Sequence, residues 1–181
     1  MNKKGKAIIA LLVVGVFAFC AVQFILIPHI NAKQEEDSAN QNDSITHDIE
    51  SVLEYKSAYC GDNSNIANLF YHLPLNSISM KFQIESENCI LFVYYLDTVW
   101  NIGEDKVQRD LIYNSVAALA LIDNLMQITY EFSGDTFTFT RVAMEDCFGK
   151  DLSSLLNKEI WKEKIQSRLN DADFVSSFYG Q

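Results

Sequence analysis

A long apolar run near the N-terminus limits what the rest of this chain can be. Residues 7–27 contain one Gln and no charged residue, and Lys3, Lys4 and Lys6 precede them. At a rise of about 1.5 Å per residue, a helix of this length spans the hydrocarbon core of a bilayer, about 30 Å. We therefore predict a transmembrane anchor over residues 7–27. Residues 1–6 are predicted to be cytoplasmic, because lysines favour that side of the membrane.

A cleaved signal peptide and a lipoprotein are the two alternatives to an uncleaved anchor. A signal peptide has a shorter apolar region followed by small residues, whereas Ile30 puts a large side chain at the first position of the best cleavage box. A lipoprotein needs a small residue before the modified cysteine, but Phe19 precedes Cys20. Both observations favour the anchor, with Cys20 as an ordinary membrane-facing residue.

The chain after the apolar run is strongly acidic. The whole sequence has 14 Lys and Arg against 24 Asp and Glu, and three of the lysines precede the run, so the part after it carries 11 basic and 24 acidic residues, a net charge of -13. Such a charge repels nucleic acid and anionic lipid headgroups. We therefore expect no nucleic-acid partner, and a basic partner or simple solubility explains the charge.

Two segments follow the anchor. Residues 28–48 are polar and acidic with almost no apolar side chain, which predicts a flexible acidic stalk. Residues 49–181 are long enough to fold as one domain with its own core. If the lysines orient the anchor, this domain is extracytoplasmic. The predicted localisation is the cell membrane, with a single pass and a cytoplasmic N-terminus.

Hydrophobic periodicity predicts the order of elements in this domain. Apolar residues at helical spacing indicate two short helices at its start, a long helix over residues 104–125 and further helices at its C-terminal end. Alternating residues predict two hairpins, with strands near 78–84, 89–96, 128–132 and 137–141. We expect an α+β fold with a four-stranded antiparallel sheet, in which the two hairpins flank the long helix and the C-terminal helices pack on one face.

Three cysteines follow the anchor, at Cys60, Cys89 and Cys147. An odd number allows at most one intramolecular disulfide, and the sequence does not decide whether Cys60 and Cys89 pair. Their scattered positions are typical of small buried hydrophobic residues and lack the spacing of a zinc site.

No group of residues has the spacing of a catalytic or metal site. Ser64 and His72 are eight residues apart, about 12 Å along a helix, which is too far for a nucleophile and its base. Ser64 is predicted to cap a helix instead, Asp62 and Asn63 to bond their own backbone, and Gly61 to supply a backbone angle that other residues avoid. We therefore predict no catalytic residue, no cofactor, no metal and no enzymatic activity.

Several motifs resemble those of a known family. They are Tyr59-Cys60-Gly61-Asp62-Asn63-Ser64 with Leu73-Pro74, then Asn114-Ser115 to Leu121-Ile122, Ile128 to Phe132, and Phe148-Gly149-Lys150-Asp151-Leu152. In this order, over residues 54–178, they resemble a family of exported or membrane-anchored domains of Gram-positive bacteria, the domain-of-unknown-function family numbered forty-eight twenty-five. The resemblance implies a fold and a location but no catalytic residue. Similar domains occur as lipoproteins and beside membrane metalloprotease-type regulators, which favours interaction or sensing.

The loop before the long helix is the second candidate region. Trp100, with Tyr94, Tyr95 and Ile102 nearby, either forms an aromatic platform for a peptide or glycan or packs back onto the core. The candidate partner-binding or motif residues are therefore Tyr59, Gly61, Asp62, Asn63, Ser64 and Trp100. The leading hypothesis is a non-catalytic interaction or sensing module that binds an envelope protein partner at the bacterial cell surface. A small cell-envelope hydrolase and a metal-responsive sensor are the alternatives.

Overall fold

The computed structural model describes residues 14–17 and 19–179. In the N-terminal unit, one helix, Val14–Gln41, is long and apolar enough to cross a membrane, judged by its length and composition alone. This finding supports the predicted anchor over residues 7–27 in its described part. The predicted cytoplasmic segment, residues 1–6, and the start of the predicted anchor lie outside the described residues.

The N-terminal helix passes Pro28 by changing its hydrogen-bond pattern. It contains the π-helical segment η1 (Val22–Leu26), in which the Ile27 amide donates to the Val22 carbonyl, and continues as α2 (Ile27–Gln41). Proline has no amide hydrogen and crowds the preceding turn, so a wider turn before it allows the helix to continue. A flexible stalk was predicted for residues 28–48. This prediction is wrong for residues 28–41, because they are helical.

The second unit begins at Asn40. Its elements, in chain order, are η2 (Ile49–Tyr55), α3 (Asn63–Phe70), β1 (Met80–Glu85), β2 (Ile90–Tyr95), α4 (Val99–Ile102), α5 (Glu104–Leu121), β3 (Gln127–Glu131), β4 (Thr136–Thr140), α6 (Arg141–Phe148), η3 (Leu152–Leu155), α7 (Lys158–Trp161), η4 (Lys162–Gln166), α8 (Ser167–Leu169) and α9 (Ala172–Ser176). The α+β class is confirmed.

The four strands form one sheet in the order β1-β2-β3-β4. Both predicted hairpins are present, because β1 pairs with β2 and β3 with β4 in antiparallel register. The prediction of a purely antiparallel sheet is wrong at its centre, where β2 and β3 are parallel. The connection between them contains α5, whose 18 residues span about 27 Å and return the chain to the end of the sheet where β2 began.

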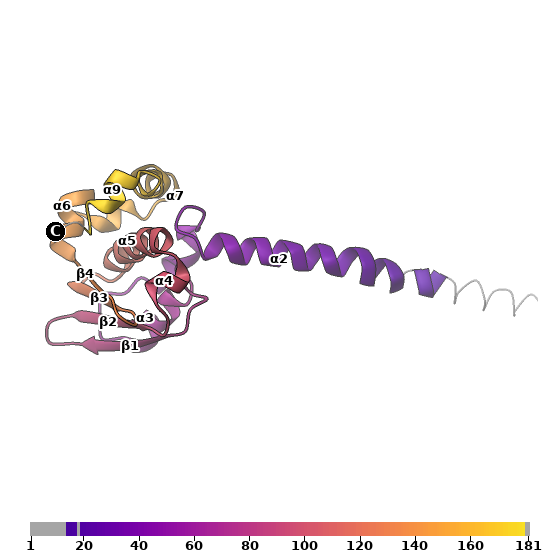
Figure 1. The fold of residues 1–181 in the computed structure, drawn as a ribbon, viewed down its shortest axis with the longest axis horizontal. Helices are drawn as coiled ribbons and strands as arrows, with labels where there is room; N and C mark the ends of the chain where they lie inside the picture. Colours follow the sequence, from indigo (N-terminus) through magenta and orange to yellow (C-terminus); the bar gives the residue numbers. More distant parts are fainter. Residues whose placement is uncertain (1–13, 18, 180–181) are drawn as a thin grey trace, which may run out of the picture. The chain divides into compact units, whose positions relative to one another are not determined.

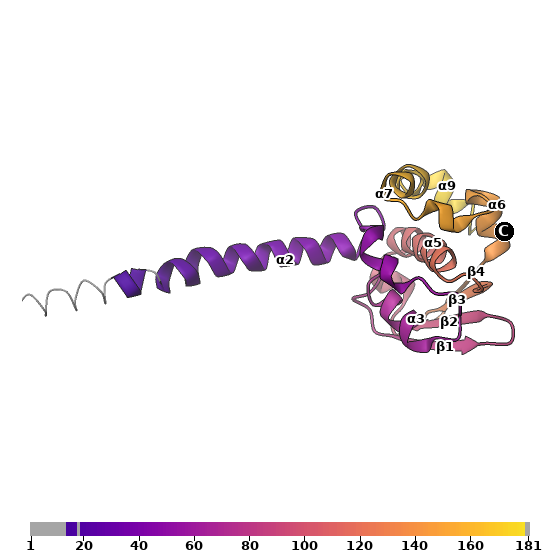
Figure 2. The same ribbon diagram turned by 180° about the vertical axis from the view of Figure 1, so that it is seen from behind.

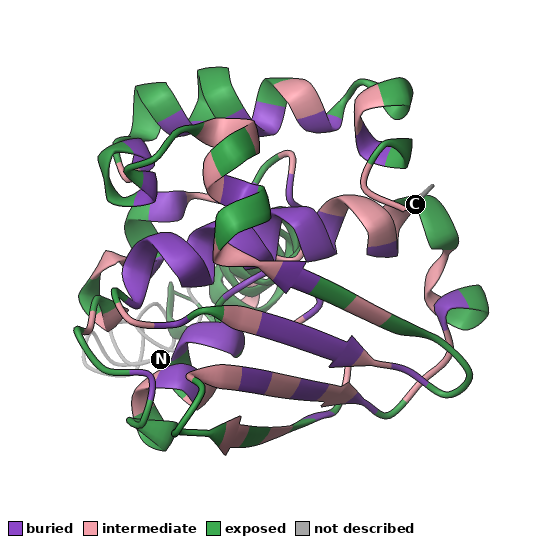
Figure 3. Cartoon of the chain, turned by 90° about the vertical axis from the view of Figure 1, so that its left-hand side faces the viewer, coloured by how far each residue is buried: buried purple, intermediate pink, exposed green. Residues whose placement is uncertain are grey.

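Helix α5 forms the centre of this unit. It lies between the sheet and the C-terminal helices α7 and α9 (Figures 1 and 2), and it is buried along most of its length (Figure 3). The C-terminal helices therefore cover α5, while Phe178 and Tyr179 reach the edge strand β4, where their rings contact Phe139.

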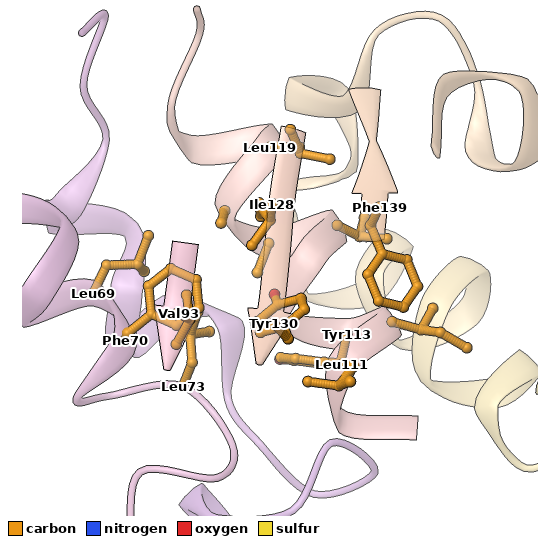
Figure 4. Close-up of a cluster of buried hydrophobic side chains, with 14 of the residues drawn as sticks. Leu69, Phe70, Leu73, Val93, Leu111, Tyr113, Leu119, Ile128, Tyr130 and Phe139 are labelled. Atoms are coloured by element: carbon orange, nitrogen blue, oxygen red, sulfur yellow. The ribbon is translucent and has the colours of Figure 1, made fainter. Parts of the chain in front are cut away.

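The core is made by side chains from the sheet, α3 and α5. Figure 4 shows Val93, Ile128, Tyr130 and Phe139 of the sheet meeting Leu69, Phe70, Leu111 and Leu119 of these helices. Burial of this apolar area supplies the main favourable term in folding. On the opposite face of the sheet, Thr136 and Thr138 are exposed.

Candidate functional site

Trp100 is the most exposed large apolar side chain of the folded unit. It lies on the one-turn helix α4, and 90% of its surface is accessible. Thr98 Oγ1 accepts a hydrogen bond from the Asn101 amide, while Asp97 Oδ1 accepts one from the Thr98 amide and one from the Asn101 side chain, each at 2.8 Å. These two bonds, that from Asn101 first, lower the pKa of Asp97. Three hydrogen bonds therefore stabilise the turn that carries the exposed indole.

The chain on either side of Trp100 fixes this turn to the rest of the fold. The Asp97 carbonyl accepts a hydrogen bond from the Ser133 amide at 3.0 Å, which connects the turn to the β3–β4 hairpin. Gly103 separates α4 from α5 with a φ of 103°, a conformation that favours glycine. Leu96 is also exposed. Trp100 is exposed, but Tyr95 is buried in the core and Tyr94 and Ile102 are half-buried, so these four side chains do not form one exposed aromatic surface.

The segment from Tyr59 to Ser64 forms the start of α3. Tyr59 is exposed, and Asp62 caps the helix by accepting the Asn65 amide at 3.0 Å. The predicted cap, Ser64, is instead inside the helix, because Asn63 is already its first residue. Asp62 takes this role because its short carboxylate reaches the amide three residues on.

Gly61 does not have the backbone angle predicted for it. The described glycines with positive φ are Gly103, Gly134 and Gly149, and a Cβ added at Gly61 would meet no atom within 4 Å. The turn is stabilised by the Asp62 cap instead, so that it does not require a left-handed residue.

The structure places the predicted site residues in two separate regions of the folded unit. The Cys60 amide donates to Asn124 Oδ1 at 2.6 Å, just after the C-terminal end of α5. Trp100 lies just before the N-terminal end of the same helix. Because α5 is about 27 Å long, Tyr59 to Ser64 and Trp100 cannot contact one small ligand together.

His72 and Asp62 participate in local structure. His72 Nδ1 lies 2.8 Å from the Asn68 carbonyl oxygen and 3.2 Å from the Tyr55 hydroxyl. Within residues 14–17 and 19–179, no hydrogen bond joins Ser64 to His72 or to Asp62. The same part of the chain contains no group of three or more His, Cys, Asp or Glu side chains that could hold a metal ion.

A buried polar cluster around His47 is the site that the sequence did not predict. His47 is 2% exposed, its Nε2 lies 2.8 Å from the His72 carbonyl oxygen and its Nδ1 2.7 Å from the Tyr113 hydroxyl. The carbonyl requires a donor, so Nε2 carries the proton and Nδ1 accepts from Tyr113. Gln166 donates to the carbonyls of Ser44 and His47. The prediction of a flexible stalk is therefore also wrong near residue 48, because Ser44 and His47 contact Asp110 and Tyr113 of α5.

Two clefts lie beside these groups. One, with a volume of about 440 Å³, is lined by His47, Lys158, Trp161 and Lys162 among others. The second, about 260 Å³, lies between α5 and the helices α8 and α9, and the Nε atom of Arg109 on its wall is buried without a hydrogen-bond partner. The first cleft has a volume within the usual range of small-molecule pockets, whereas the second is smaller than that range.

Burial of His47 predicts a loss of stability in acid. Burial lowers the pKa of His47 from 6.5, while the hydrogen bond to His72 acts in the opposite direction. A lowered pKa means that the stability is present above about pH 6.5 and is lost as the pH falls through the folded-state pKa. We expect the urea midpoint of the wild type to fall from pH 7.5 to pH 5 by more than that of His47→Gln. His29→Gln, on exposed α2, is the control, and an equal fall in His47→Gln would contradict the prediction.

The fold and these sites define a small α+β domain behind an apolar N-terminal helix. Residues 52–141 match the family model described as "Domain of unknown function (DUF4825)". The match confirms the predicted resemblance from η2 to the start of α6, while the motif at residues 148–152 lies beyond it. No curated protein and no solved structure matches the chain.

Proposed function

We propose that this protein is a single-pass membrane protein whose folded unit faces the outside of a Gram-positive bacterial cell and binds an envelope protein, without catalysing a reaction. The apolar helix Val14–Gln41 supports the anchoring. The lysines at residues 3, 4 and 6 support the orientation, because positive residues favour the cytoplasmic side.

The exposure of Trp100 is the observation that carries the proposed binding role. Tryptophan is among the residues that contribute most to protein–protein binding, and it contributes most from a rigid support at the centre of an interface. The hydrogen bonds of Asp97 provide that support, and Leu96 adds exposed apolar surface beside it in the chain. Because 90% of its surface is exposed, the indole contributes little burial to the stability of the isolated domain.

The charge of the folded unit indicates the character of the partner. Residues 40–181 contain 10 Lys and Arg against 21 Asp and Glu, a net charge of -11. Acidic surfaces accelerate association with basic ones and repel acidic ones. We therefore expect a partner with a basic rim around an apolar pocket that accepts the indole.

Substitution of Trp100 tests the proposal. We expect Trp100→Ala to reduce the yield of a crosslinked envelope partner from native membranes by about 30-fold, since a hot-spot residue contributes about 2 kcal/mol or more. Val142→Ala removes another exposed apolar side chain, 58% accessible, from α6 and is the matched control. Equal yields from the two variants would exclude Trp100 as the binding residue.

A further inference from the structure

Two cysteines from distant parts of the sequence meet in the folded unit. The Cys60 amide donates to Asn124 Oδ1 at 2.6 Å, and the Cys89 carbonyl accepts from the Met126 amide at 2.9 Å. Asn124 and Met126 are two residues apart in the same loop. Both cysteines are therefore held against one short stretch of chain between α5 and β3.

The Cys89 thiol donates to the Ser86 carbonyl at 3.6 Å, and it also influences the ionisation of the Cys60 thiol. Cys60 is buried, Cys89 is half-buried, and neither is in a disulfide. Burial first, and then a hydrogen bond and charge interaction with the Cys89 thiol, raise the pKa of Cys60 to about 11. Cys147 has different surroundings on α6, where its carbonyl accepts a hydrogen bond from Arg168.

We propose that Cys60 and Cys89 form a disulfide bond that fastens the segment from Tyr59 to Ser64 to the β1–β2 turn, while Cys147 remains a thiol. The hydrogen bonds of both cysteines to residues 124 and 126 support this pairing. Its formation in cells rests on the proposed function, because disulfides persist in compartments outside the reducing cytoplasm.

The reaction requires a disulfide as oxidant, either a small one or that of a thiol–disulfide oxidoreductase. The more accessible Cys89, as its thiolate, attacks one sulfur of the oxidant, which forms a mixed disulfide and releases one thiolate. The Cys60 thiol then loses its proton to solvent and attacks Cys89 Sγ, which releases the second thiolate. Two protein thiols are oxidised to one disulfide, and the oxidant is reduced to two thiols.

The high pKa of Cys60 gives this reaction a characteristic pH dependence. Because Cys60 must ionise before it attacks, and because its burial is the first cause of the raised pKa, we expect the rate of closure from the mixed disulfide to rise with pH between pH 7 and pH 10. Closing a loop of about 30 residues also restricts the unfolded chain, so we expect reduction to lower the Tm by about 10 °C.

Oxidation of the full-length protein in detergent tests the pairing. After treatment with oxidised glutathione, N-ethylmaleimide should label only Cys20 and Cys147, and mass spectrometry of a digest should find Cys60 and Cys89 linked. Labelling of all four cysteines, or a linked peptide that contains Cys147, would overturn the proposal.

Measurements on cysteine variants and on whole cells distinguish a failure of the proposed disulfide from a failure of the proposed function. Cys89→Ser should prevent the bond, Cys60→Ala should do so from the other side, and Cys147→Ser should leave the bond intact. Acid quenching of whole cells before labelling then reports whether the bond exists there. A bond found in the oxidised purified protein but absent in cells would count against the outward placement of the folded unit, whereas a bond absent from both would overturn the pairing.

Discussion

Lys106→Met is expected to destabilise the folded unit by about 3–5 kcal/mol, because it would leave the buried Asp110 carboxylate without its cation. The Asp110 side chain is 1% exposed, and its Oδ2 lies 2.6 Å from Lys106 Nζ. Its other oxygen accepts the Ser44 amide at 3.1 Å. Burial raises the pKa of Asp110, and the interaction with Lys106 opposes this rise.

The midpoint of urea unfolding measures this loss, and two further variants give its cause. Lys158→Met breaks an exposed ion pair with Asp48 and should change the midpoint little. Lys106→Met combined with Asp110→Leu removes both charges and should recover most of the stability. A raised carboxyl pKa means that stability is lost as the pH rises from the unfolded-state pKa, near 3.8, to the folded-state pKa. The defect of Lys106→Met should therefore shrink as the pH falls toward about 4 and be largely absent below it. A loss no larger than that of Lys158→Met would contradict the prediction.

Arg141→Met is expected to cost about 3–4 kcal/mol, because it would remove three charge-assisted hydrogen bonds to carbonyl oxygens at and just after the end of α5. The guanidinium donates to the carbonyls of Leu119, Ile122 and Leu125 at 2.7, 2.8 and 2.8 Å. Its planar set of donors reaches all three at once, and the helix C-terminus favours a positive charge. Arg141 therefore fastens the start of α6 to the end of the central helix.

Urea unfolding of three variants distinguishes this capping role from simple loss of charge. Arg141→Lys keeps the charge but cannot reach all three carbonyls, so we expect an intermediate loss. Lys150→Met removes a charge from an exposed pair with Asp146 and should have little effect. If Arg141→Lys were as stable as the wild type, charge alone would explain the role of Arg141.

Local patterns predicted the elements of the fold well, but its distant contacts less well. Alternation along β1 to β4 reports the two faces of each strand directly. This alternation does not show whether the adjacent strands of two hairpins run parallel. For β2 and β3, that direction depends on the path of α5 between them. The predicted end of that helix at residue 125 is also too late, since Ile122 leaves the helix and Ser57 pairs with it.

The sequence predicted the Trp100 site but not the buried polar cluster around His47. Trp100 was predicted because an aromatic residue in a loop is visible in the sequence. The role of His47 was missed because its surroundings are polar, and polar segments are typical of unfolded chain. Asp48, which caps η2 by accepting the Glu50 amide, is the local signal that could have placed the start of the folded unit earlier.

Site-specific photocrosslinking from position 100 in native membranes tests the proposed binding role most directly. A photoreactive phenylalanine analogue at residue 100 should give one discrete adduct with an envelope protein, and the same analogue at residue 142 should not. Adducts of equal yield from both positions, or none from position 100, would contradict a binding surface centred on Trp100.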